Sequence, residues 1–193
     1  MVPASTAASS AAKQSAGAAL LAGTTDPGTV TISAYLCPSD PHGGKFNTTH
    51  IGWGNHMPGD YLGVSGTSVM ARDGLFFSGH CVRLRDVTDG TSQTLAFGER
   101  GIPTDLETGW MLCAGGNEPV YTGNQDNHLS TAVGLKPPGP NDRDNDRHFW
   151  SWHPGGANFL FADGSVRVLG NAIDRSVLQR LSTRSAGDLA GEF

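Results

Sequence analysis

Residues 148–169, HFWSWHPGGANFLFADGSVRVL, constrain the fold more strongly than the rest of the chain. They predict a β-hairpin, because two largely apolar runs flank the dipeptide Asp163-Gly164. Asp-Gly is strongly favoured in a two-residue type I′ turn, where both central residues need a positive φ. The sequence therefore predicts two antiparallel strands joined at Asp163 and Gly164.

Side-chain alternation assigns the two faces of this hairpin. With a two-residue turn, Phe161 pairs with Val166 and Phe159 pairs with Val168. These four apolar side chains then lie on one face, which we expect to join the core. Arg167 points to the opposite face.

Periodicity in the remaining segments predicts an α+β fold. Short apolar or alternating runs predict further strands at residues 30–36, 60–64, 74–77, 94–97 and 109–113. A helical spacing of apolar residues predicts one amphipathic helix over residues 171–182, with its apolar side formed by Ile173, Val177, Leu178 and Leu181. We expect a small, mostly antiparallel sheet of short strands with long loops and a C-terminal helix.

Length and charge narrow the class of protein. The chain has 193 residues, enough for one domain with a real core. Residues 1–28 are rich in Ala, Ser and Gly and predict an arm or a residual helix end, and residues 29–193 predict a single globular domain. The formal net charge of −5 argues against a nucleic-acid partner, because phosphate binding needs clustered basic residues.

Several motifs resemble one known family. His153, nine intervening residues and Asp163-Gly164 reproduce the His-x9-Asp-Gly signature of a prepilin-type-processing-associated family, a planctomycete-type domain of unknown function. Other segments agree with that family in order: Leu36-Cys37-Pro38-Ser39-Asp40-Pro41, Asp73-Gly74-Leu75-Phe76, DVTDGTSQTLAFGE at 86–99 and Leu181-Ser182-Thr183-Arg184. The resemblance covers residues 30 to 193.

The resemblance implies a structural rather than an enzymatic role. It implies the globular head of a type II secretion pseudopilin-like subunit, located outside the cytoplasm in the periplasm or at the cell surface. The partners would be other pseudopilin-like subunits or further copies of the chain. Relatives begin with a basic leader and a long apolar helix that anchors them in the membrane. Residues 1–28 lack both, so we expect the pilin helix to be absent or truncated and this chain to make no membrane contact.

Cysteine and histidine residues suggest two further sites. Cys37, Cys81 and Cys113 form no zinc-type pair, and we expect either a Cys81–Cys113 disulfide or ordinary buried thiols. A glycine-rich loop carries three histidines whose spacing matches no tight ligand set, and surface histidines are the commoner interpretation: His42, His50 and His56.

An acidic run is the candidate calcium site. Asp142, Asp144 and Asp146 alternate, as the first oxygen ligands of a calcium loop do, and major pseudopilins bind calcium near their C-terminal end. The continuation differs, because Arg147 stands where such loops need Gly. A solvated acidic loop is the alternative, and no other cofactor is expected.

The signature residues themselves allow a catalytic and a structural interpretation. His153 and Asp163 could form a His–carboxylate pair, but the sequence shows no nucleophile elbow, and turn geometry already explains Asp163. We therefore expect no catalytic residue and a structural role for His153, Asp163 and Gly164. Trp150 and Trp152 could form a surface patch that stacks on sugars. A cell-envelope module that binds glycan or protein is thus the alternative function, followed by a hydrolase using His153 and Asp163.

Overall fold

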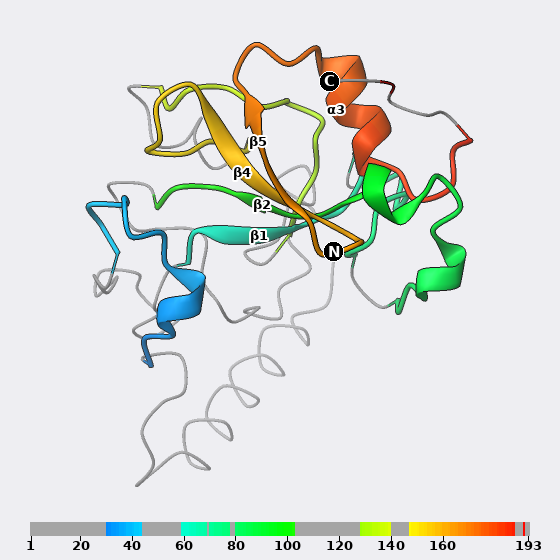
Figure 1. Ribbon diagram of the computed structural model, residues 1–193, viewed down its shortest axis with the longest axis horizontal. Helices are drawn as coiled ribbons and strands as arrows, with labels where there is room; N and C mark the ends of the chain where they lie inside the picture. Colours follow the sequence, from blue (N-terminus) through cyan, green and yellow to red (C-terminus); the bar gives the residue numbers. More distant parts are fainter. Residues whose placement is uncertain are drawn as a thin grey trace, which may run out of the picture.

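The computed structural model describes residues 30–43, 59–68, 70–77, 80–102, 128–139, 147–187 and 191. Within these residues the chain forms one five-stranded sheet and a C-terminal α-helix (Figure 1). The strands are β1 (Tyr61–Val64), β2 (Leu95–Glu99), β3 (His128–Leu129), β4 (Gly156–Phe161) and β5 (Val166–Gly170), and the helix is α3 (Arg175–Ser182). Three 3-10 helices complete the described elements: η2 (Ser33–Tyr35), η3 (Leu84–Asp86) and η4 (Thr91–Gln93). The predicted α+β class is confirmed.

The sheet is mostly antiparallel, as expected, with one parallel pair. Its strand order is β3-β1-β2-β4-β5. Strands β1, β2, β4 and β5 form three consecutive antiparallel pairs, whereas β3 runs parallel to β1 at the edge. Strand β3 was not predicted, because two residues give too little pattern to reveal a strand.

The predicted hairpin is present, but its turn is longer by one residue. Leu160 pairs with Val166, so three residues rather than two connect the strands. Only Gly164 has a positive φ, of 88°, and Asp163 does not. The amide of Gly164 donates to the carbonyl of Phe161 at 3.0 Å, which is a type I turn followed by a left-handed glycine. The expected type I′ turn is therefore wrong.

This one-residue change exchanges the two faces of β5. Val166 and Val168, expected in the core, are 64% and 68% exposed. Arg167, expected on the other face, lies beside the buried aromatic residues, with its guanidinium 4.3 Å from the centre of the Phe161 ring. On β4 the expected inward residues are correct, because Phe159 and Phe161 are both fully buried.

The core lies between one face of the sheet and helix α3. Leu178 and Leu181 of the helix are fully buried, and Ile173 and Val177 pack against the same cluster, as the periodicity predicted. The helix begins later than expected because Asp174 caps it, its side chain accepting from the amide of Ser176. None of the described helices is long and apolar enough to cross a membrane.

Two expected strands are absent from the described sheet. Residues 30–36 contain the 3-10 helix η2 and are largely exposed, although their β-branched residues favoured a strand. Residues 74–77 follow β1 without strand geometry, and the Phe76 amide donates to the carbonyl of Val64 at 3.2 Å. β propensity reflects packing against neighbours, which residues 30–36 lack.

Several predictions concern residues outside the described ranges. These are the arm at 1–28, the strand at 109–113, the histidines His50 and His56, the acidic run Asp142, Asp144 and Asp146, and Cys113. Cys37 and Cys81 are free thiols, the first buried and the second exposed.

Candidate functional site

Three side chains from distant parts of the sequence meet at one end of the sheet. Cys37 follows η2, Glu99 is the last residue of β2, and His153 precedes β4. The Sγ atom of Cys37 lies 3.3 Å from Nε2 of His153, and the same nitrogen lies 3.6 Å from Oε1 of Glu99. The three donor atoms all lie within 4.8 Å of one another. Cys37 and Glu99 are buried, and His153 is partly exposed.

Two further buried carboxyls lie next to this cluster. Asp60 precedes β1, and its Oδ2 accepts from the backbone amide of Cys37 at 2.6 Å. Asp40 accepts from the amides of His42 and Ile102, each at 2.7 Å. We call the five residues Cys37, Asp40, Asp60, Glu99 and His153 the polar cluster. Hydrogen bonds of Asp60 with Cys37 and of Asp40 with Ile102 join the segment around η2 to the residues next to β1 and β2.

Burial and neighbouring charges shift the acidities in the polar cluster. Burial, followed by the adjacent Asp40 side chain, raises the pKa of Asp60 well above its usual range. Burial also raises the pKa of the Cys37 thiol, with Glu99 and Asp60 adding to the effect and a backbone hydrogen bond from Ser39 opposing it. Burial and the same acidic groups raise the pKa of Tyr61 to about 12.

The geometry differs from that of a nucleophile–His–carboxylate triad. In such a triad the nucleophile and the carboxylate bind opposite nitrogens of the imidazole ring. Here Cys37 and Glu99 both approach Nε2 of His153. The arrangement converges on one point rather than relaying a proton across the ring.

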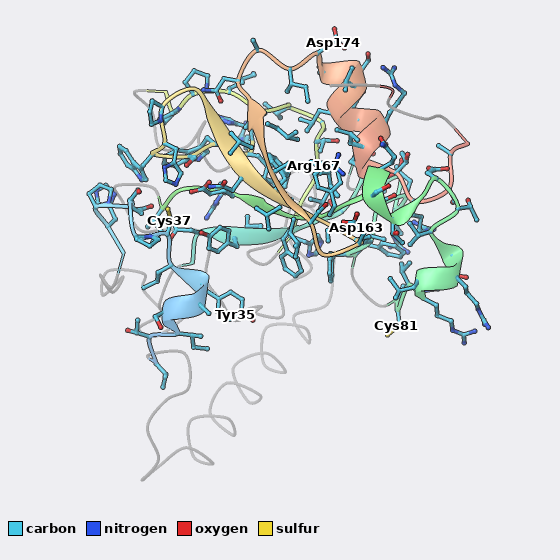
Figure 2. All side chains as sticks on the ribbon, in the orientation of Figure 1. Tyr35, Cys37, Cys81, Asp163, Arg167 and Asp174 are labelled. Carbon is cyan, nitrogen blue, oxygen red and sulfur yellow. The ribbon has the colours of Figure 1, made fainter. Side chains whose placement is uncertain are left out.

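The His–carboxylate pair that His153 and Asp163 could have formed is not present. The Asp163 carboxylate accepts from both the amide and the hydroxyl of Ser165, at 2.8 and 2.7 Å, and these bonds lower its pKa. Asp163 lies at the opposite end of the sheet from Cys37, which His153 contacts (Figure 2). The six residues of β4 separate the two signature positions, a span of about 20 Å. The structure therefore does not bring together the two residues on which the hydrolase alternative rested, whereas a turn role for Asp163 and Gly164 agrees with it.

The structure does not contain the possible surface patch of two exposed tryptophans, Trp150 and Trp152. Trp150 is 1% exposed, because it packs against the backbone of Gly101 in the position where a side chain at residue 101 would lie. Trp152 is 36% exposed and contacts Trp150 edge to face and the ring of His42. Strand alternation was a poor guide here because residues 151–155 leave the sheet. A single partly exposed tryptophan is a weak basis for glycan stacking.

Sequence reasoning found one member of the polar cluster and missed the others as a group. His153 was identified as a signature residue and Cys37 as a thiol, whereas Glu99 was noted only within the segment at 86–99. The sequence feature that could have identified the polar cluster was the family resemblance. Cys37 and Asp40 come from LCPSDP, Glu99 ends DVTDGTSQTLAFGE, and His153 opens the His-x9-Asp-Gly signature. Segments that carry the resemblance thus converge in space.

Comparison with known proteins gives a family match. The model of the family described as "Protein of unknown function (DUF1559)" matches residues 3–176 of the chain. No curated protein and no solved structure matches.

Proposed function

This chain belongs to the DUF1559 family, and we propose that it is a structural subunit, the globular head of a pseudopilin-like protein outside the cytoplasm. In this proposal it works with type II secretion or pilus-type filaments, and its partners are other pseudopilin-like subunits or further copies of itself. The motifs at residues 36–41, 86–99 and 153–164 support the proposal through their resemblance to prepilin-type-processing-associated proteins.

The observation that carries the proposal is how the polar cluster uses its carboxyl groups. Asp40 accepts from the amide of Ile102, 62 residues away, and Asp60 accepts from the amide of Cys37, 23 residues away. Glu99 accepts from the amide of Asn158, 59 residues away. Buried carboxyl groups that bind backbone amides of distant segments fix those segments to one another. We infer that these carboxyl groups hold segments of the fold together and do not take part in a reaction.

The segment that these carboxyl groups hold lies at the N-terminal end of the described domain. Residues 30–43 follow directly on residues 1–29 and are the first described part of the domain. Their backbone is also tied to the sheet directly, since the amide of Asp60 donates to the carbonyl of Tyr35 at 2.8 Å. In a pseudopilin-like subunit the preceding N-terminal segment anchors the head. Mechanical force on the head would then act on the junction between that segment and residues 30–43. A junction held by several buried hydrogen bonds suits that task.

The proposal assigns no catalytic residue. In the polar cluster, Cys37 and Glu99 share one nitrogen of His153 and so do not form the nucleophile–His–carboxylate relay that a hydrolase would need. The net charge of −5 disfavours a role on nucleic acid. In this proposal the chain acts by assembly, through contacts between the surfaces of neighbouring subunits.

Cross-linking in the source cells tests the proposal. The cells are treated with an amine- or carboxyl-reactive cross-linker and separated into cytoplasmic and envelope fractions, and the protein is detected by immunoblotting. We expect envelope-associated protein with a ladder of cross-linked species that contain this chain or pseudopilin-like partners. A protein that is cytoplasmic and stays monomeric under the same treatment would contradict the proposal. An unrelated periplasmic protein of similar abundance serves as the control for random cross-linking.

A further inference from the structure

We infer that Cys37, Glu99 and His153 form a binding site for one Zn²⁺ ion. The inference concerns these three side chains alone. It goes beyond the structural role proposed above and does not depend on it. If it is correct, the metal ties together η2, the end of β2 and the start of β4.

The spacing of the donor atoms fits a tetrahedral metal centre. Zinc binds sulfur at about 2.3 Å and nitrogen or oxygen at about 2.0–2.2 Å, which places neighbouring ligand atoms roughly 3.3–3.8 Å apart in a tetrahedron. The distance from Sγ of Cys37 to Nε2 of His153 is 3.3 Å, and that from Nε2 to Oε1 of Glu99 is 3.6 Å. The remaining separation is within 4.8 Å, so only a small side-chain adjustment is needed.

The hydrogen-bonding roles of the three side chains also support a metal site. One imidazole nitrogen cannot accept a proton from the thiol and donate one to the carboxylate at the same time. A protonated Nε2 can donate to both groups, whereas with a cation between them all three atoms act as electron-pair donors. Three electron-pair donors that face a common point, all within 4.8 Å of one another, are what a metal centre requires.

Hydrogen bonds outside the three ligands hold them in place. The Oε2 atom of Glu99 accepts from both the backbone amide and the side-chain amide of Asn158, each at 2.9 Å, which leaves Oε1 turned toward His153. The backbone amide of His153 donates to the hydroxyl of Ser151 at 3.0 Å. The backbone amide of Cys37 is held by Asp60. Metal ligands are commonly oriented by an outer set of bonds of this kind.

The donor set selects the class of metal. A thiolate, an imidazole and a carboxylate together favour zinc or a similar late first-row ion, whereas Ca²⁺ and Mg²⁺ prefer all-oxygen sites. Three protein ligands leave a fourth position, which we assign to water because the His153 side chain is 37% exposed. The site is thus distinct from the acidic run at Asp142, Asp144 and Asp146.

Metal titration of the full chain tests the inference. The recombinant protein is treated with a chelator, dialysed and titrated with Zn²⁺ in competition with a chromophoric chelator, and Co²⁺ is used to observe thiolate coordination by its absorption. We expect one ion per chain and a sulfur-to-cobalt charge-transfer band. Cys37→Ser and His153→Gln should each weaken Zn²⁺ binding by about 100-fold or more, since loss of even an outer-shell partner commonly costs 10–100-fold. The control Cys81→Ser, at the exposed free thiol, should bind like wild type.

Alkylation of the wild-type protein covers the case in which a ligand variant does not fold. Iodoacetamide is added with and without Zn²⁺, and the labelled peptides are quantified by mass spectrometry. Zn²⁺ should protect Cys37 at least tenfold while Cys81 reacts equally in both samples. Absence of Zn²⁺ binding, unchanged binding by a folded Cys37→Ser variant, or equal labelling of Cys37 in both samples would each overturn the inference.

Discussion

Substitution of Asp40 gives the sharpest test of whether the polar cluster holds residues 30–43 to the rest of the fold. Its side chain is completely buried, and its two oxygens accept from the amides of His42 and Ile102, each at 2.7 Å. In Asp40→Asn one of these oxygens becomes an NH2 group. Whichever way the amide is oriented, one backbone N–H then faces a donor instead of an acceptor. The substitution changes hydrogen bonding while leaving the volume almost unchanged.

The size of the effect follows from that single lost acceptor. An unpaired buried N–H costs about 1–3 kcal/mol. With an m value of about 2 kcal/mol per molar urea, the midpoint of unfolding should fall by about 0.5–1.5 M. Hydrogen exchange should also become faster in residues 30–43 and at Ile102, because these are the groups that Asp40 holds.

Asp86→Asn is the matched control. The Asp86 side chain is 48% exposed and accepts from the amide of Arg83 at 3.0 Å, so the same atomic change occurs where water can replace the lost bond. Its urea midpoint should stay close to that of wild type. A folded Asp40→Asn variant as stable as Asp86→Asn, with unchanged exchange in residues 30–43, would refute the reasoning.

Three other predictions address the core and the pH response. Leu178→Ala should lower the free energy of unfolding by about 2–5 kcal/mol, because it removes a fully buried side chain; a urea-melt difference below about 1 kcal/mol would show that α3 is not part of the core. Gly98→Ala should cost about 1–3 kcal/mol, since its new Cβ would lie 2.7 Å from the Phe149 ring, whereas Gly170→Ala, with 3.7 Å to its nearest neighbour, should be much milder; equal melting temperatures would contradict this packing. Burial lowers the pKa of His128 below its ordinary value of 6.5, so below pH 6.5 the unfolded chain binds a proton that the folded chain does not, and stability should fall as pH decreases. Compared with wild type, His128→Gln should show a smaller loss of stability between pH 7 and pH 5, and identical slopes in urea melts would disprove this contribution.

Local sequence patterns predicted the helix and the strands whose apolar residues follow a regular spacing within one short segment. The amphipathic spacing of Leu178 and Leu181 located helix α3, and the short run before Glu99 located β2. The strand β1 was also predicted to within one residue. For α3 the apolar face that the periodicity implies is the face that packs against the core.

The hairpin shows where local signals stop. The Asp-Gly dipeptide correctly placed the turn, but it suits both a two-residue turn and a three-residue turn with a left-handed glycine. The choice depends on the rest of the fold. With the longer turn, Arg167 reaches both the Phe161 ring and the carbonyl of Ser92, 75 residues away, and Val166 and Val168 take the outer face. A contact with so distant a residue has no trace in the local pattern.

The polar cluster was beyond pattern reasoning for a similar reason. Cys37 and His153 are 116 residues apart, and Cys37 has no second cysteine two to four residues away. Only the sheet brings them together, because β2 and β4 pair and carry Glu99 and His153 to the same end. Family resemblance marked the segments involved, but their contact is a property of the fold.

Intact and peptide mass spectrometry of the protein isolated from its source cells tests the proposed subunit role most directly. The account predicts a mature N-terminus created by prepilin-type processing, with an N-methylated residue at the head of an apolar segment that precedes the described domain. A native protein that starts at Met1 without such a segment would contradict it.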